Sequence, residues 1–69
     1  MKKYLVVYEK VGKNYSAFCP DLPGCMATGS TKREAEKNIK EAIGLHLEGL
    51  KEDNLPVPEP RTSINYVQV

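Results

Sequence analysis

Only a few side chains in this 69-residue chain are of the types that carry out chemistry, and their spacing favours structural roles. Cys19 and Cys25 are six positions apart, and with His46 they supply three of the four ligands that a structural zinc site needs. His46 has no carboxylate and nucleophile on its own helical face, as a catalytic histidine would have. We therefore expect no catalytic residue, no metal site and no bound cofactor.

The acidic residues of the first half are equally sparse. Acid–base hydrolysis needs paired carboxylates, whereas Glu9 and Asp21 lie in separate turn regions. Asp21 belongs to the turn Pro20, Asp21, Leu22, Pro23 and Gly24, where its simplest role is an Asx-type hydrogen bond to the turn backbone. Proline followed by glycine predicts a type II turn, with positive φ at Gly24.

Composition narrows the classes of protein further. Ten Lys and Arg residues against nine Asp and Glu residues give a net charge of +1, which offers no strong basic field for nucleic acid. No apolar run approaches the ~20 residues of a membrane span. Two cysteines fall short of a disulfide framework, so we expect a cytoplasmic protein with reduced thiols. A Cys19–Cys25 bridge across the intervening turn remains an alternative.

The hydrophobic pattern predicts a single α+β domain over residues 1–69, with the element order β-β-β-α-β. Strands are expected at residues 4–8, 15–19, 25–29 and 63–69, and a helix at residues 32–50. Thr31 and Glu34 predict a capping box at the start of the helix. The proline-rich tether Leu55–Pro60 should let the last strand return to an antiparallel meander, beside the first strand.

One helix can cover only one face of this sheet, yet the first strand is apolar on both faces. A contiguous exposed apolar patch usually marks an interaction site. The candidate oligomer or partner surface comprises Tyr4, Val6, Tyr8, Tyr15, Gly44 and Leu45. The alternative is that the tether folds back over the uncovered face.

Residues 15–25, which read Tyr-Ser-Ala-Phe-Cys-Pro-Asp-Leu-Pro-Gly-Cys, resemble the Y-x-A-x-x-P-D-L-P-G-C signature of HicB-type antitoxins. The similarity continues through residues 27–31, 38–43, 45–50 and 56–60. It implies a partial RNase H-like fold and a protein that neutralises an mRNA-cleaving, HicA-like toxin by steric masking. It also implies a homo-dimer or homo-tetramer that needs no cofactor.

Many HicB antitoxins carry a C-terminal helix-turn-helix or ribbon-helix-helix segment that binds DNA. The resemblance here extends only to the final strand, so DNA binding is not expected. Two other functions remain open. One is a stand-alone oligomeric interaction protein of the same fold with no toxin partner. The other is a residual enzyme, either a thiol enzyme or a metal-dependent nuclease, which would need a carboxylate cluster to hold its metal.

Overall fold

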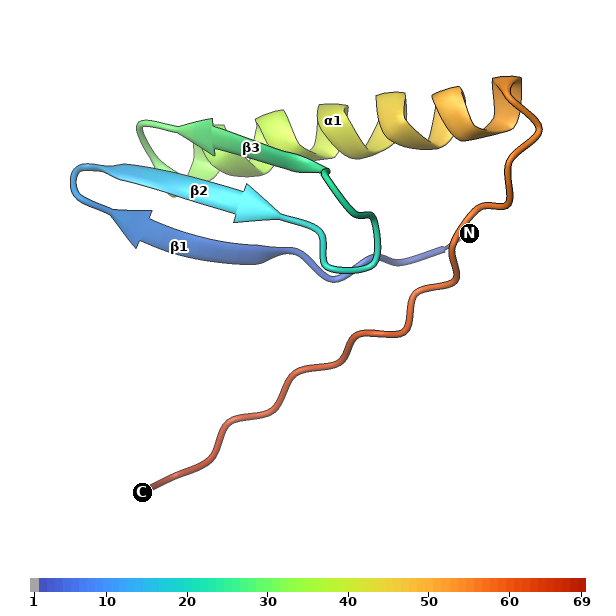
Figure 1. Ribbon diagram of the computed structural model, residues 1–69. Coiled ribbons are helices and arrows are strands. Elements are labelled where there is room, and N and C mark those ends of the chain that lie inside the picture. Colours follow the sequence, from blue (N-terminus) through green and yellow to red (C-terminus); the bar gives the residue numbers. More distant parts are fainter. Residues whose placement is uncertain (1) are drawn as a thin grey trace.

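A three-stranded antiparallel sheet packs against one long helix (Figure 1). The computed structural model describes residues 2–69. Its elements are β1 (Val7–Val11), β2 (Asn14–Phe18), β3 (Met26–Gly29) and α1 (Lys32–Glu52). The strands lie in the order β1-β2-β3 and both neighbouring pairs are antiparallel. The predicted α+β class, with a meander followed by one helix, is confirmed.

Two turns join the strands, and each has a glycine at positive φ. Val11 pairs with Asn14, which leaves a two-residue hairpin loop with Gly12 at φ +62°. In the loop from β2 to β3, Gly24 has φ +82° and the Leu22 carbonyl accepts a hydrogen bond from the Cys25 N–H at 3.0 Å. This is the type II geometry that Pro23 followed by Gly24 predicts.

The start of α1 departs in one detail from the predicted capping box. The Glu34 N–H donates to the Thr31 side-chain oxygen at 3.1 Å, as expected. The Glu34 carboxylate, however, accepts from the backbone N–H of Ser30 at 3.2 Å, and not from that of Thr31. Both bonds satisfy backbone donors ahead of the first helical turn, so the helix still begins at Lys32.

The core lies between the helix and the side of the sheet that faces it. Its buried members are Ala17, Cys19, Leu22, Cys25, Ala35 and Ile39. Gly29 allows the end of β3 to approach the first helical turn, because a Cβ there would lie only 2.9 Å from the Glu34 carbonyl carbon. The packed face of α1 carries the buried Ala35 and Ile39, with Ile43 and Leu47 partly buried against the same core, and His46 is half-buried.

Two predicted elements differ from the structure. The first strand was expected at residues 4–8, but the ladder with β2 begins at Val7 and runs to Val11. The expected last strand, residues 63–69, pairs with nothing in the three-stranded sheet of the described chain. A strand needs an edge as well as a propensity, and this segment extends away from the body (Figure 1).

Candidate partner-binding surface

The side chains of the sheet divide between a face that the helix covers and a face that it leaves open. Cross-strand partners share a face, and the register aligns Tyr8, Ala17 and Ala27. Ala17 is buried in the core with the helical residues. Burial raises the pKa of Tyr8, and the Glu36 carboxylate of α1 raises it further. This row therefore faces the helix.

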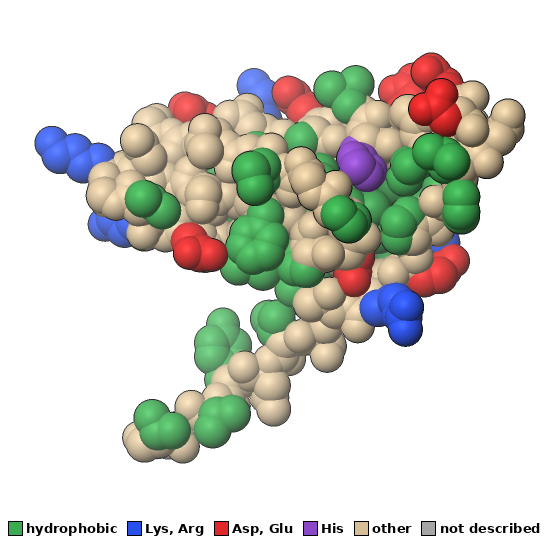
Figure 2. Space-filling view, in the orientation of Figure 1, with side chains coloured by type: hydrophobic (Ala, Val, Ile, Leu, Met, Phe, Trp, Pro, Cys, Tyr) green, Lys and Arg blue, Asp and Glu red, His purple; other side chains and the backbone are tan. Residues whose placement is uncertain are grey.

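The open face carries the neighbouring row, in which Val7, Phe18 and Met26 are aligned across the three strands. These three residues define what we call the sheet patch. Val7 and Phe18 are partly exposed, and Met26 is 70% exposed. Hydrophobic side chains gather near the middle of the body in the space-filling view (Figure 2). An apolar row of this kind on an uncovered sheet is a candidate contact for another protein.

The six residues predicted from the sequence as a partner surface do not form one patch. Tyr4, Val6, Tyr8 and Tyr15 are partly buried and pack against the core. Gly44 and Leu45 lie on exposed parts of α1, and Leu45 is 71% exposed. Their contact with a partner stays a prediction. The sheet patch could not be identified from the sequence. The alternation of side chains along a strand separates the two faces of the sheet, but it does not show which face the helix will cover.

The loop between β2 and β3 is closed by its own backbone. The Cys19 N–H donates to the Cys25 carbonyl at 3.1 Å, and the Leu22 N–H donates to the Cys19 carbonyl at 3.1 Å. Both thiols are free and buried. Burial raises the pKa of Cys25, and the neighbouring Cys19 adds to the effect. A nucleophilic cysteine needs a lowered pKa, so this environment favours a packing role for Cys25.

Asp21 binds a distant part of the chain, where an Asx bond to its own turn was expected. Its two carboxylate oxygens accept from the Thr62 hydroxyl at 2.8 Å and the Thr62 N–H at 3.2 Å. Desolvation acts to raise the pKa of Asp21, but the hydrogen bonds from Thr62 and Arg61 and the Arg61 charge outweigh it and hold the pKa below its usual value. Asp21 thus anchors the segment that follows the tether.

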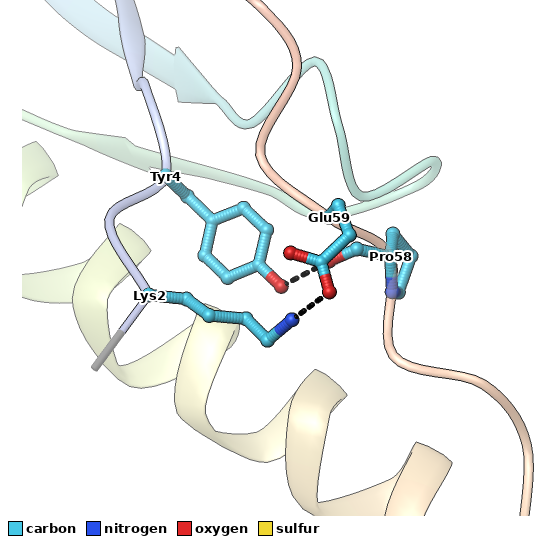
Figure 3. Close-up of polar contacts among 4 residues, drawn as sticks. All are labelled: Lys2, Tyr4, Pro58 and Glu59. Atoms are coloured by element: carbon cyan, nitrogen blue, oxygen red, sulfur yellow. Dashed lines mark hydrogen bonds and ion pairs between the residues drawn. The ribbon is translucent and has the colours of Figure 1, made fainter.

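The tether itself is held against residues that precede β1 (Figure 3). The Tyr4 hydroxyl donates to the Pro58 carbonyl at 2.6 Å, and Lys2 forms an ion pair with Glu59. The tether therefore lies beside the N-terminal segment. The strand row that carries Val7, Phe18 and Met26 takes no part in these bonds.

Two further observations concern metal and membrane. Among residues 2–69, no group of three or more His, Cys, Asp and Glu side chains lies close enough to hold a metal ion. Within the same residues, α1 is the single helix, and it is not apolar enough over its length to cross a membrane.

Fold and surface together define a small α+β domain with a packed helical face and an uncovered apolar row on its sheet. Residues 4–69 match the family model described as the HicB-like antitoxin of bacterial toxin–antitoxin systems. The chain belongs to the HicB-like antitoxin family.

The chain is also similar to individual proteins and to a solved structure. An uncharacterised 14.9 kDa protein of Haemophilus phage HP1 is 41% identical over 93% of the chain, which spans only 48% of the phage protein. A UPF0150 protein of Synechocystis is 47% identical, covering 81% of the chain and 72% of the relative. A chain of the HicA3 and HicB3 toxin–antitoxin complex superposes with a TM-score of 0.72 and 30% identity, over 87% of this chain and 70% of its own.

Proposed function

We propose that this chain is an antitoxin-like module that binds a HicA-type, mRNA-cleaving toxin and neutralises it by steric masking. The observation that carries the proposal is the likeness, at a TM-score of 0.72 and 30% identity, to a chain solved in a toxin–antitoxin complex. Steric masking of a toxin requires a surface that is complementary to the toxin, and it requires no catalytic group. This requirement is consistent with the raised pKa of the Cys25 thiol and the engagement of both Asp21 carboxylate oxygens.

The sheet patch is the contact surface that we favour for the toxin. Aromatic residues, phenylalanine included, and methionine are enriched in protein–protein interfaces relative to the rest of the surface. Phe18 is such an aromatic residue, with Val7 and Met26 on either side of it in the cross-strand register. The residues on α1 predicted from the sequence, Gly44 and Leu45, form the second candidate surface, and the experiment separates the two.

The test is co-expression with a HicA-like toxin. Co-purification and growth rescue are measured for the unchanged chain, for Met26→Asp and for Leu45→Asp. The two altered residues are 70% and 71% exposed, so each substitution places a similar charge on a similarly exposed apolar position. We expect Met26→Asp to weaken toxin binding by roughly tenfold or more, while Leu45→Asp changes it by less than about twofold.

The outcomes are distinct. If Leu45→Asp weakens toxin binding and Met26→Asp does not, the toxin contact lies on α1 and not on the sheet patch. A chain that neither binds the toxin nor restores growth would refute the toxin-directed function and favour the stand-alone oligomeric protein. Nuclease activity has no supporting observation, because Asp21 is engaged by Thr62 and Glu9 is an exposed side chain on β1.

A further inference from the structure

A cavity of about 460 Å³ lies between the C-terminal half of α1, the segment before β1 and the tether. Three of its lining residues share one stripe of the helix at four-residue spacing: Ile43, Leu47 and Lys51. The remaining lining residues are Lys2 and Tyr4, which precede β1, and Val57 of the tether. The lining includes no residue of the sheet patch, so the cavity is separate from the surface that we favour for the toxin.

The interior of this cavity is apolar and its walls are fixed by the fold. Tyr4, Ile43 and Leu47 are partly buried and pack against the core. The Tyr4 hydroxyl donates to the Pro58 carbonyl at 2.6 Å, so the ring is held beside the tether and offers apolar surface to the cavity (Figure 3). The volume lies within the range of pockets that hold small molecules. The cavity is therefore suited to a compact hydrocarbon group.

The charged side chains that line the cavity are both lysines. Lys2 is paired with Glu59, which neutralises its charge (Figure 3). Lys51 lies in the last turn of α1 and takes part in no ion pair within residues 2–69. The cavity therefore presents one uncompensated positive charge beside an apolar interior.

This arrangement of charge selects the head group of a ligand. A lysine ammonium binds a carboxylate through charge-assisted hydrogen bonds, which are stronger than those to a neutral group. The C-terminal end of a helix carries partial negative charge and does not itself attract an anion, so the attraction depends on the Lys51 side chain. A carboxylate is therefore favoured over an alcohol, and an ammonium group is disfavoured by repulsion.

We propose that this cavity binds a small amphipathic carboxylate of the medium-chain fatty-acid class. The hydrocarbon chain lies against Tyr4, Ile43 and Leu47, and the carboxylate pairs with the Lys51 ammonium group. Removal of the hydrocarbon chain from water supplies most of the affinity, and the ion pair sets the preference for an anionic head group. The proposal rests on the cavity and its lysines and does not depend on toxin binding.

The direct test is a titration of the full chain with octanoate, followed by NMR of the methyl groups of Ile43, Leu47 and Val57. We expect their shifts to saturate with a Kd of about 1 mM or below. Octan-1-ol and octylammonium carry the same hydrocarbon chain, and we expect them to bind at least about threefold and about tenfold more weakly. Shifts that do not saturate at these methyl groups, or equal binding of the three compounds, would overturn the proposal.

A matched pair of variants provides the second readout. Lys51→Gln and Lys40→Gln each remove one positive charge from an exposed position on α1, and Lys40 lies outside the cavity lining. We expect Lys51→Gln to weaken octanoate binding at least about threefold and to leave octan-1-ol binding within about twofold, with helical circular dichroism retained. Lys40→Gln should leave octanoate binding within about twofold. An equal effect of the two variants on octanoate, or an equal loss of octanoate and octan-1-ol binding in Lys51→Gln, refutes the pairing of the carboxylate with Lys51.

Discussion

The close approach of β3 to α1 makes Gly29 the position where one added methyl group should matter most. Gly29 is buried at the end of β3. A Cβ built on it would lie 2.9 Å from the Glu34 carbonyl carbon and 3.0 Å from the Ala35 Cα, and closer still to the Ala35 nitrogen. All three atoms belong to helix backbone, which cannot rotate away as a side chain could. Gly29→Ala must therefore push the first turn of α1 away from the sheet.

The expected cost follows from overpacking, which typically destabilises a core by about 1–3 kcal/mol. We expect Gly29→Ala to lower the free energy of unfolding by about 2 kcal/mol. For a domain of this size each kcal/mol changes Tm by about 4–8 °C, so Tm should fall by about 8–16 °C. The same substitution at Gly44 is the control, because a Cβ there meets nothing within 4 Å. Relief of glycine's helix penalty should make Gly44→Ala more stable by about 0.5–1 kcal/mol.

The assay is urea and thermal unfolding followed by circular dichroism at 222 nm, at one fixed protein concentration because self-association would couple to stability. The two alanine substitutions add the same atoms and should move the free energy of unfolding in opposite directions. A loss below about 0.5 kcal/mol for Gly29→Ala would refute the packing argument, since a surface substitution has an effect of that size.

Two further predictions concern titratable groups. Because the pKa of Asp21 is lowered in the folded chain, its bonds to Thr62 should stabilise the fold fully above the unfolded pKa of about 3.9, and this stabilisation should be lost as pH falls through the folded pKa. In an NMR pH titration, the Thr62 amide resonance should therefore move with a midpoint below about 3.9. A midpoint above that value would contradict the role of Asp21 as an anchor. Burial raises the pKa of Cys25, so both thiols should react with iodoacetamide at least about tenfold more slowly in the folded chain than in denaturant, and equal rates would contradict their packing role.

The turn between β2 and β3 and the start of α1 can be predicted from residues that are close together in the sequence. Pro23 followed by Gly24 defines a turn through a fixed φ and a tolerated positive φ, and the structure has Gly24 at φ +82°. Thr31 ends the preceding extended segment and caps the helix because its hydroxyl is within reach of the Glu34 N–H. Each signal involves residues within four positions of one another, so no knowledge of the rest of the fold is required.

Long-range pairing accounts for what the sequence alone left undetermined. The run from Tyr4 to Tyr8 favours a strand, but the register with β2 begins the ladder at Val7, and Tyr4 instead packs against the core and binds Pro58. Alternation in β2 separated Ala17 from Phe18, yet only the docking of α1 decided which of them is buried.

Residues 63–69, at the C-terminal end of the chain, show the same division most clearly. Their amino acids by themselves determine that they favour a strand, since β-branched and aromatic side chains fit a pleated sheet. Whether they join a ladder is decided by the tertiary structure, in which the Asp21–Thr62 bonds hold the chain just before this segment and the segment itself lies outside the three-stranded sheet. Strand propensity is local, whereas a ladder requires an edge that the folded chain brings within reach.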